Sequence, residues 1–368
     1  MFDALDTEMM QNALALARLG RFSTSPNPRV GCVIARGSQI VGQGFHIQAG
    51  GPHAEVHALR QAGDLAKGAT AYVTLEPCSH YGRTPPCAEG LIKAGVARVV
   101  AAMTDPNPLV AGKGLAMLEA AGIDVQSGLL EHEARALNRG FLSRIERGRP
   151  FVRLKCAASL DGKTALSDGK SQWITGSEAR ADVQVLRAES CAVITGIGTV
   201  LADDPQLNVR AFPTLRQPVR VVLDSKLQTP LDSHLVSNGK NPTIIATLID
   251  DESRYQPYLA HAHVRIIKPS ENQHGLIDLH DLLGKLAELG LCEVMVEAGM
   301  TLASAFISAD LVDEIVLYQA PKILGNPGRG LFNLMENPLS LDRPPDWMTI
   351  SFTALGNDIK WVLQRSSL

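Results

Sequence analysis

Hydrophobic and polar positions along the chain follow two periods in turn, and this alternation predicts helices interleaved with strands. Residues 1–20 carry apolar side chains at helical spacing and end at Gly20. Two short β-rich runs within residues 25–44 flank Arg36-Gly37-Ser38, which predicts a hairpin. The first half then continues with expected strands at 71–75, 96–103 and 123–126 and expected helices at 53–63, 86–95, 112–122 and 130–144. This order predicts a sheet covered on both faces, an α/β/α sandwich.

The second half repeats the alternation. A helix is expected over residues 177–189, with Ser177 as its N-cap. The other expected elements are strands that open at 151 and 191 and lie at 218–225, 242–248, 263–267 and 313–320, a helix at 276–290, a strand–turn–helix unit at 292–307 and a hairpin at 348–368. This is a nucleotide-binding α/β layout, although no Gly-x-Gly-x-x-Gly follows its first strand. Glycine turns lie later, at 196–198 and at Gly299, where backbone N–H groups at a helix start could bind an anion.

Length and local composition indicate two domains. A chain of 368 residues is long for one domain. The charged segment 140–150 ends in Gly148 and Pro150, which places the boundary near residue 148. We therefore expect domains at 1–147 and 148–368, and we interpret the arginines of the segment, Arg149 among them, as a solvated link.

Composition and charge narrow the class of protein. The chain is 45% hydrophobic and 20% charged, as in ordinary globular proteins, and its net charge of −3 argues against a nucleic-acid substrate. No apolar run approaches the roughly 18 residues that span a membrane. The first residues are acidic where a signal peptide would be basic. Four cysteines in apolar stretches read as buried free thiols in a reducing cytoplasm: Cys32, Cys156, Cys191 and Cys292.

The candidate chemistry is concentrated in the stretches PHAEVHAL and TLEPCSHYGRTPPC. They offer His53, Cys78 and Cys87, one imidazole and two thiolates, as ligands of one Zn²⁺ ion. Three protein ligands leave a fourth position for water, which is typical of catalytic zinc. Glu55, two residues from the first ligand, remains as the catalytic proton carrier, and this signature is that of zinc-dependent nucleobase deaminases. Structural zinc, or no metal, is the alternative.

The spacing of His53 and Glu55 requires a helix that begins here. Residues two apart in a helix interior point about 200° away from each other, so they could not share a site. The preceding Gly50-Gly51-Pro52 allows a helix start, where side chains reach past the helix end. By the same reasoning Pro77 places Cys78 at or near a helix start, whose N–H groups favour a thiolate. His57 is interpreted as an ordinary helix residue.

Three further residues near these motifs are candidate substrate contacts. Asn27 lies between two prolines, and its amide could bind a pyrimidine edge or simply form a turn. His80 and Arg83 lie in the polar loop between the two cysteines. This loop could hold a phosphate, and the Arg83 guanidinium is suited to bind one.

Four stretches of the first half together resemble the bifunctional riboflavin-biosynthesis deaminase–reductase family: PNPRVGCVI, PHAEVHAL, TLEPCSHYGRTPPC and DPNP. The wider cytidine-deaminase-like superfamily usually has two residues between its cysteines, whereas the eight found here match the riboflavin branch. The resemblance implies hydrolytic deamination of 2,5-diamino-6-ribosylamino-4(3H)-pyrimidinone 5′-phosphate by zinc-activated water, with Glu55 moving the protons.

The second half resembles the reductase domain of the same family, through VRLKCAASLDGKTA, SQWITG, TGIGTVLADDPQLNVR and VEAGMTLA. The resemblance implies a dihydrofolate-reductase-like fold that uses NADPH to reduce the ribosyl group to ribityl. It implies a cofactor site at Ala157, Trp173, Thr199, Asp203, Ser225, Gly299, Met300, Thr301, Leu302, Ala303, Ser304 and Ala305. The implied substrate contacts are Ser171, Arg187, Leu207, Arg210 and Glu297, with Lys155 a further candidate. Met300 stands where the family commonly has proline, and Trp173 could instead pack in the core.

Other interpretations remain open at this point. One is a deaminase that edits tRNA or nucleotides, against which the long inter-cysteine loop and the mild acidity weigh. Another is a scaffold or nucleotide sensor with structural zinc, against which Glu55 and the open ligand position weigh. A third is a deaminase whose second domain binds nucleotide without catalysis. We expect a small phosphorylated pyrimidine as substrate, a homo-oligomer, a cytoplasmic location, and no nucleic-acid or membrane partner.

Overall fold

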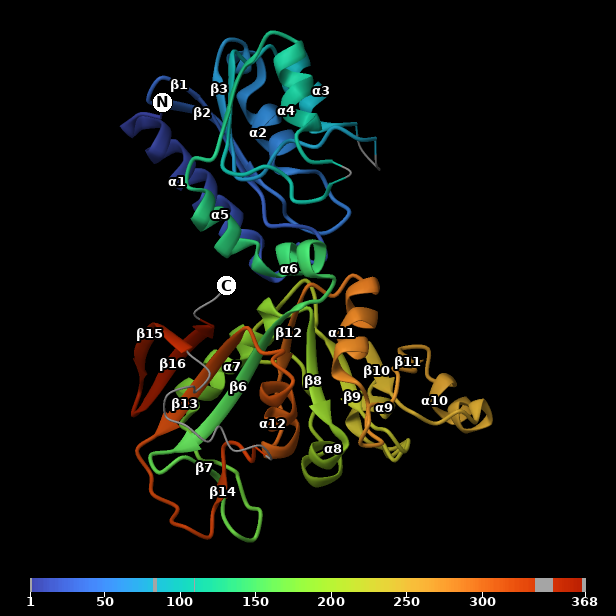
Figure 1. Cartoon of the computed structure of the whole chain (residues 1–368). Helices are drawn as coiled ribbons and strands as arrows, with labels where there is room; N and C mark the ends of the chain where they lie inside the picture. Colours follow the sequence, from blue (N-terminus) through green and yellow to red (C-terminus); the bar gives the residue numbers. More distant parts are fainter. Residues whose placement is uncertain (1, 82–84, 109, 335–346, 366–368) are drawn as a thin grey trace. The chain divides into compact units, whose positions relative to one another are not determined.

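The chain divides into two compact units, Met1–Gly148 and Arg149–Leu368 (Figure 1). The computed structural model describes residues 2–81, 85–108, 110–334 and 347–365, and each unit is treated by itself. No helix among these residues has both the length and the apolar composition that crossing a bilayer requires.

The first unit is built on a five-stranded sheet with the order β2-β1-β3-β4-β5. Strand β1 pairs antiparallel with β2 and β3, and β3, β4 and β5 run parallel. The elements are α1 (Ala4–Leu19), β1 (Gly31–Arg36), β2 (Gln39–Phe45), α2 (Ala54–Ala62), β3 (Thr70–Val73), α3 (Cys87–Ala94), β4 (Arg98–Ala101), α4 (Lys113–Ala120), β5 (Asp124–Ser127), α5 (Glu131–Leu137) and α6 (Arg139–Arg147). The predicted α/β/α sandwich is confirmed.

Strand β1 shows how this sheet is buried on both faces. Cys32 and Ile34 belong to the core formed with α2, α3 and α4, whereas Val33 and Ala35 belong to the core formed with α1 and α6. Successive side chains of a strand point to opposite faces, so a continuous apolar run fills both cores. Helix α2 approaches β2 closely: a Cβ at Gly44 would lie 2.7 Å from the Ala54 carbonyl oxygen.

The single helix predicted over residues 130–144 is wrong, because the chain forms two helices that meet at Asn138. Asn138 is 3% exposed. Its Oδ1 accepts a hydrogen bond from the Arg29 N–H (2.7 Å), and its Nδ2 donates to the Arg29 carbonyl (3.0 Å). A buried amide that bonds a distant backbone interrupts the helix, and α5 and α6 therefore end and begin on either side of it.

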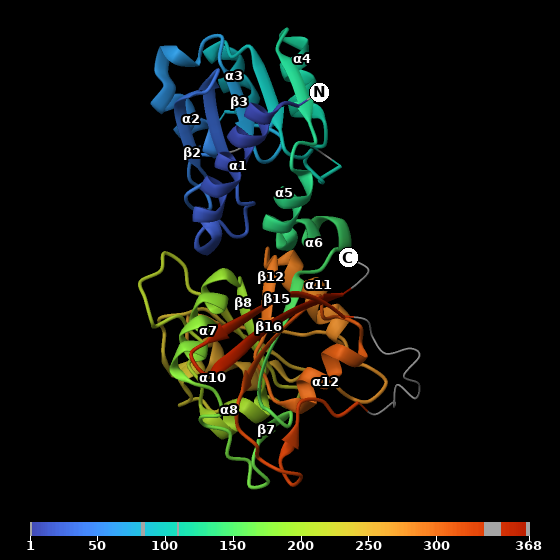
Figure 2. The same cartoon turned by 90° about the vertical axis from the view of Figure 1, so that its left-hand side faces the viewer.

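The second unit contains a nine-stranded sheet with the order β11-β10-β9-β8-β12-β6-β13-β16-β15 (Figure 1 and Figure 2). All pairs from β11 to β13 are parallel, and β16 and β15 add an antiparallel hairpin. Its elements are β6 (Phe151–Ser159), β7 (Lys163–Ala165), α7 (Ser177–Glu189), β8 (Ala192–Gly196), α8 (Ile197–Asp203), β9 (Val219–Leu223), α9 (His234–Ser237), β10 (Thr243–Ala246), α10 (Gln256–Leu259), β11 (Val264–Ile267), α11 (Leu279–Glu288), β12 (Glu293–Val296), α12 (Met300–Ser308), β13 (Glu314–Ala320), β14 (Arg329–Gly330), β15 (Trp347–Leu355) and β16 (Asp358–Arg365).

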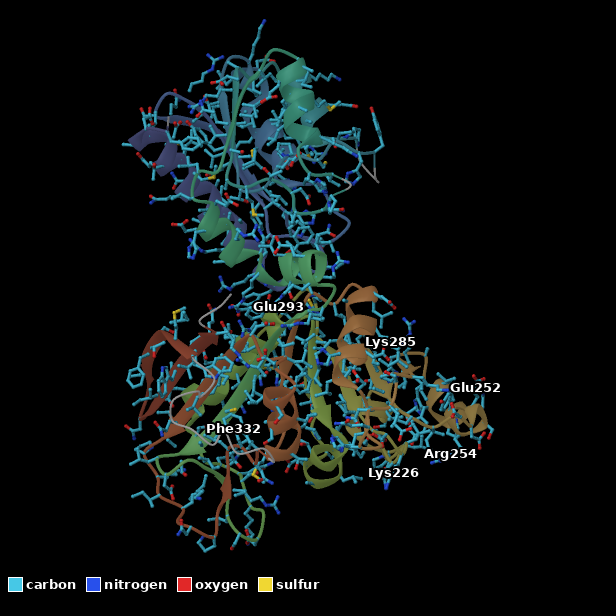
Figure 3. The ribbon with its side chains drawn as sticks, viewed as in Figure 1. Lys226, Glu252, Arg254, Lys285, Glu293 and Phe332 are labelled. Atoms are coloured by element: carbon cyan, nitrogen blue, oxygen red, sulfur yellow. The ribbon has the colours of Figure 1, made fainter. Side chains whose placement is uncertain are left out.

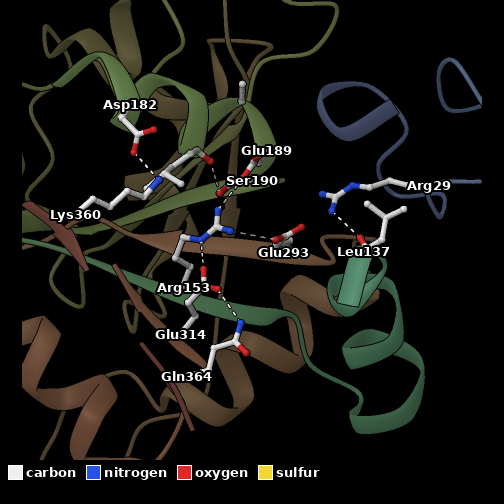
Figure 4. A network of polar contacts seen from close by, with 12 residues as sticks. Arg29, Leu137, Arg153, Asp182, Glu189, Ser190, Glu293, Glu314, Lys360 and Gln364 are labelled. Carbon is white, nitrogen blue, oxygen red and sulfur yellow. Dashed lines mark hydrogen bonds and ion pairs between the residues drawn. The ribbon is translucent and has the colours of Figure 1, made fainter. Parts of the chain in front are cut away.

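A buried ion network ties the central strands of this sheet together (Figure 4). Arg153 on β6 is 3% exposed, and its guanidinium contacts Glu314 on β13 (2.5 Å), Glu293 on β12 (3.7 Å) and Glu189 at the end of α7 (3.4 Å). Burial opposes its charge, but the three carboxylates raise the pKa of Arg153 above its usual value. A buried guanidinium needs such partners, so the network links α7 and the central strands.

Two sequence expectations at the start of this unit are wrong. Gly176, not Ser177, is the N-cap of α7, and its N–H donates to Asp358 Oδ2 (2.5 Å). Arg149 is not part of a solvated link, because its guanidinium forms two hydrogen bonds with Asp313 (2.8 and 2.9 Å). In both cases the partner is a carboxylate more than 150 positions away, which no local pattern indicates.

Candidate functional site

The first unit brings His53, Cys78 and Cys87 together. His53 Nδ1 lies 3.3 Å from Cys87 Sγ and 3.6 Å from Cys78 Sγ. The three ligand atoms all lie within 4.8 Å of one another. Ligand atoms of a tetrahedral Zn²⁺ site with ordinary Zn–N and Zn–S distances are about 3.5 Å apart. The spacing and the chemistry of these donors therefore fit one zinc ion.

Local structure explains why His53 and Glu55 can share this site. His53 is the N-cap of α2 and has extended backbone angles (φ −75°, ψ 167°), so it lies outside the helical period. Glu55 lies in the first turn and is 3% exposed. The angular separation that holds for a helix interior does not apply across a helix start.

Cys78 does not lie at a helix start, contrary to the sequence expectation; the helix begins at Cys87. The Cys87 N–H, at the start of α3, donates a hydrogen bond to Cys78 Sγ (3.3 Å). A hydrogen bond from the Cys87 thiol and contact with His53 lower the pKa of Cys78 to about 4, against the effect of burial. The helix terminus thus stabilises the thiolate of the neighbouring segment.

Glu55 has the environment of a proton carrier. Among the residues that the structure describes, its Oε2 is buried without a hydrogen-bond partner. Burial raises the pKa of Glu55 above its usual value, and the nearby Cys78 thiolate acts in the same direction. A carboxylate oxygen that is buried and unpaired is costly unless a ligand or water meets it. The Glu55 side chain is therefore suited to accept and return a proton at a bound substrate.

The site also depends on Glu76, which sequence reasoning missed. Glu76 is 4% exposed, and its two carboxylate oxygens accept backbone N–H groups from one loop and one helix start. These donors are Asp105 (3.0 Å), Gly112 (2.9 Å), Gly114 (2.8 Å) and Leu115 (3.4 Å). They fix the segment that leads into Cys78. Its position directly before the Pro77-Cys78 pair was the only available signal.

The candidate substrate residues of this unit differ in their surroundings. Asn27 Nδ2 lies 3.1 Å from His46 Nε2, and His46 Nδ1 lies 3.0 Å from the Pro52 carbonyl. The His46 and His53 rings meet edge to face at 5.4 Å. This chain of contacts brings Asn27 to the metal site, and His46 was not anticipated. His80 is exposed, and the prediction for Arg83 lies outside the described residues.

The second unit gathers a charged cluster around Glu297. Arg187 is 7% exposed and forms two hydrogen bonds with the Glu297 carboxylate (2.8 and 3.0 Å). Lys155 Nζ lies 3.9 Å from Glu297 Oε1, and Arg187 also donates to the Asn208 carbonyl (3.0 Å). Burial opposes the charge, but Arg187 and Lys155 hold the pKa of Glu297 at about 2. Arg210 is exposed, so it is the guanidinium of the group most accessible to a ligand.

The predicted cofactor residues follow the carboxyl ends of parallel strands. Thr199 and Asp203 lie on α8 after β8, Ser225 follows β9, and Gly299 is the N-cap of α12 after β12. Ligands of open α/β sheets bind at this edge. Ala157 and Ser171 are half-buried, as are Met300 and Leu302, whereas Thr301 and Ala305 are exposed.

Four of the predicted residues have surroundings that bear on their roles. Trp173 is 61% exposed with the Arg180 guanidinium 4.7 Å from its ring centre, so the core-packing alternative is wrong. Leu207 is 2% exposed and belongs to the core. Ala303 and Ser304 also face inward, at 3% and 5% exposure.

A cytidine-deaminase-like unit with a zinc-type ligand set, followed by a dihydrofolate-reductase-like unit, defines the class of protein: a bifunctional deaminase and reductase. Residues 4–103 match the cytidine and deoxycytidylate deaminase zinc-binding region, and residues 150–361 match the RibD C-terminal domain. The chain belongs to the RibD family of riboflavin biosynthesis proteins.

Individual relatives agree with this assignment. The chain is 53% identical to riboflavin biosynthesis protein RibD of Escherichia coli K12, over 89% of this chain and 91% of the relative. It is 49% identical to RibD of Haemophilus influenzae, over 98% and 97%. The solved structure of Acinetobacter baumannii RibD matches with TM-score 0.90 and 47% identity over 99% of both chains. A Thermotoga maritima deaminase/reductase structure matches with TM-score 0.86 and 33% identity over 98% of this chain and 99% of that one.

Replacing Glu76 by glutamine is expected to loosen the segment before Cys78. An amide has one acceptor oxygen, so at least one group of backbone N–H donors would face the NH₂ group. The local free energy of opening should fall by roughly 1–3 kcal/mol. Hydrogen exchange of peptides that cover residues 105–115 measures this change. Glu89→Gln, at an exposed hydrogen bond with Tyr81, is the control and should leave exchange unaltered. Unchanged protection in Glu76→Gln would contradict the assigned role.

Proposed function

We propose that this protein deaminates 2,5-diamino-6-ribosylamino-4(3H)-pyrimidinone 5′-phosphate and then reduces the ribosyl group of the product to ribityl. The Thermotoga relative is described as a diaminohydroxyphosphoribosylaminopyrimidine deaminase/5-amino-6-(5-phosphoribosylamino)uracil reductase. The observation that carries the proposal is the Glu55 Oε2, which is buried beside the cluster of His53, Cys78 and Cys87 and has no partner within the described part of the chain. It supports a hydrolytic site rather than a structural metal centre.

In the deaminase unit, His53, Cys78 and Cys87 would hold one zinc ion. Zinc supplies a nucleophile at neutral pH, because it lowers the pKa of a bound water to about 7. Glu55 would take one proton from that water and give it to the ring nitrogen, and it would then carry the second proton of the water to the amine, which leaves as ammonia. Its raised pKa suits this task, since a group that titrates nearer neutrality both accepts and donates. Asn27 would orient the pyrimidine through its amide, whose Nδ2 contacts His46.

In the reductase unit, NADPH would bind along the carboxyl edge of the sheet. It supplies hydride for C1′ of the ribose. The donor set supports this cofactor: the first N–H groups of α12 are not paired within the helix, and a Cβ built at Gly299 would meet nothing within 4 Å, so a phosphate could approach. Arg210 and Lys155 would bind the substrate phosphate and sugar. Glu297 would hold Lys155 and Arg187 in place, since it contacts both.

A two-stage assay on zinc-replete protein tests the whole proposal. Given the diaminopyrimidine ribosyl phosphate, the protein should release ammonia without nucleotide and then oxidise NADPH when it is added. Glu55→Ala should retain zinc and lose at least about 10²-fold in ammonia release, because only the proton transfer is removed. That variant should still reduce the deaminated substrate. Zinc content is measured by elemental analysis.

Two matched variants separate the roles in this assay. Cys87→Ser should lose zinc and ammonia release together, and Arg60→Ala, an exposed change on α2, the helix that carries Glu55, should lose neither. Ammonia release by Glu55→Ala at the wild-type rate would contradict the assignment. Ammonia without NADPH oxidation in the wild type would favour a second domain that binds nucleotide without catalysis.

Arg210→Ala should raise the KM of the reductase for its phosphorylated substrate by about tenfold or more, because a charge-assisted phosphate contact is lost. The kcat should change little, since Arg210 is remote from the hydride in this assignment. NADPH oxidation on the deaminated substrate measures both constants. Lys285→Ala, on α11 (Figure 3), is the control. An unchanged KM would rule out the phosphate role.

The edge of the second sheet supports a homo-oligomer. Strand β15 is one of the two edge strands of this sheet among the described residues, and it carries no charged side chain. Met348, Ile350 and Phe352 are 50%, 50% and 62% exposed. Long exposed edges without charge or proline invite pairing with another chain. We infer that a second copy of this chain pairs with β15. Two-fold pairing places identical residues near each other, and β15 carries no charged side chains that would then repel one another.

Phe352→Lys is expected to shift the protein from dimer to monomer, since it places like charges near the two-fold axis. Analytical ultracentrifugation at micromolar concentration measures the change. Leu215→Lys, at an isolated residue that is 74% exposed, should leave the mass unchanged. A wild-type protein that sediments as a monomer, or a Phe352→Lys variant that remains a dimer, would exclude this interface.

A further inference from the structure

The segment that leads into helix α7 carries two of the residues assigned to the reductase site. Residues 171–176 belong to no helix or strand, and they end at Gly176, the N-cap of α7. Ser171 is a predicted substrate contact, and Trp173 is a predicted cofactor contact whose side chain is 61% exposed. The positions of both residues therefore depend on the contacts that hold this segment.

Two cationic side chains hold the middle of the segment. The Arg180 guanidinium donates a hydrogen bond to the Thr175 carbonyl (2.7 Å) and lies 4.7 Å from the centre of the Trp173 ring. Lys322 Nζ donates to the Trp173 carbonyl (2.8 Å). Both donors are long side chains, which lose conformational entropy when they are held in one position. They leave the last residue of the segment to be fixed by another group.

A carboxylate from the C-terminal hairpin fixes that last residue. The Gly176 N–H donates a hydrogen bond to Asp358 Oδ2 (2.5 Å), although the two residues are 182 positions apart. A glycine N-cap offers no side-chain acceptor of its own. Asp358 is 4% exposed and lies at the start of a helix of 13 residues, where a negative charge is favourable. Its hydrogen bond is charge-assisted and therefore among the stronger kinds.

The turn of the β15–β16 hairpin places Asp358 at this helix start. Leu355 pairs with Asp358, so Gly356 and Asn357 form a two-residue turn. Gly356 has a φ of 60°, and a Cβ there would lie 3.0 Å from Glu178 Cδ, so the turn packs directly against the first turn of α7. Strand β16 pairs with β13 in the main sheet. The carboxylate is therefore presented from a rigid support.

Asp358 differs from the other buried aspartates that face α7 and the sheet, because it has no cationic partner. Asp182 pairs with Lys360 and Asp313 pairs with Arg149. Asp358 forms no ion pair with any residue that the structure describes. A carboxylate that is buried without a cation is costly, and the start of α7 is the positive group that offsets this cost.

The same face of β16 makes a second contact with α7, which does not reach the segment. Lys360 lies two residues after Asp358, so the two side chains point to the same face of the strand. Lys360 Nζ lies 2.6 Å from Asp182 Oδ2 (Figure 4). Within the described part of the chain, neither member of this pair bonds to residues 171–176. The ion pair docks the hairpin on α7, whereas Asp358 alone connects the hairpin to the segment.

We propose that Asp358 is a positioning residue of the reductase, because it holds the segment 171–176 in one place. Ser171 and Trp173 then present substrate and cofactor to each other in a single geometry. This inference rests on the proposed function, in which the second unit reduces the ribosyl group with NADPH. Each reactant keeps its other contacts, at Arg210 and at the start of α12. Loss of Asp358 therefore changes the relative orientation of the reactants, which lowers kcat more than it raises KM.

Steady-state NADPH oxidation by the full-length protein, on the deaminated substrate, tests this role. Asp358→Ala should lower kcat by about tenfold or more and leave each KM within about threefold, because a displacement of about 1 Å can cost about 10²-fold in rate. Asp358→Asn keeps the shape and one acceptor oxygen but not the charge, so its kcat should fall by only about threefold. Thermal unfolding of each variant verifies that the fold is intact.

Lys360→Ala is the matched control, because it removes a contact between the same hairpin and the same helix. Its kcat should stay within about twofold of the wild type, as expected for one partly exposed ion pair. An equal fall of kcat in Lys360→Ala and Asp358→Ala would overturn the proposal, since docking of the hairpin would then explain both. A wild-type kcat in Asp358→Asn, or in a folded Asp358→Ala, would also overturn it.

A double-mutant cycle with Trp173→Ala separates positioning from a general loss of stability. When Trp173 is already absent, adding Asp358→Ala should lower kcat further by less than about threefold, because the two changes act through one segment. A further fall as large as in the wild-type background would overturn the proposal. A wild-type protein that does not oxidise NADPH would instead overturn the proposed function, and this inference with it.

Discussion

Both sites depend on a helix that begins beside the end of a strand. The first N–H groups of a helix have no partner within it, and they favour negative charge. In the first unit the Cys87 N–H at the start of α3 donates to the Cys78 sulfur, and His53 lies at the N-cap of α2. In the second unit Gly299 is the N-cap of α12, where the proposed cofactor phosphate would bind. Parallel strands bring their carboxyl ends to one edge, so such helix starts converge there.

Two buried carboxylates close to the metal ligands differ in their hydrogen bonds. Glu76 meets four backbone N–H groups, which occupy both of its oxygens, so it holds a loop in place. Glu55 is equally buried, but among the described residues its Oε2 has no partner. A structural acid gains from being satisfied, whereas an acid that moves protons must remain available to a ligand. Asp224 also has one unpaired buried oxygen, so it is the position of Glu55 beside the cluster of His53, Cys78 and Cys87 that marks it as the proton carrier.

The second unit contains two networks of charged side chains, and they have different roles. Arg153 is held by three glutamates away from any ligand edge, and it fixes the central strands. Glu297 instead holds Lys155 and Arg187 close to the carboxyl edge, at the end of β12. The first network stabilises the sheet, and the second positions cations around the space above it.

The sequence by itself determined the chemistry of the first site and the order of the elements. His53, Cys78 and Cys87 could be selected because few residue types bind zinc, and the strand and helix periods follow from which faces are buried. Only the tertiary structure decided that two helices meet at Asn138 and that the Arg187 guanidinium binds the Glu297 carboxylate. It also decided that the Cys78 sulfur accepts a hydrogen bond from the first N–H of a helix that starts nine residues later. These outcomes rest on one or two hydrogen bonds between residues that are separated in the sequence. A hydrophobic period carries no information about such pairs, so they become visible only when the chain is folded.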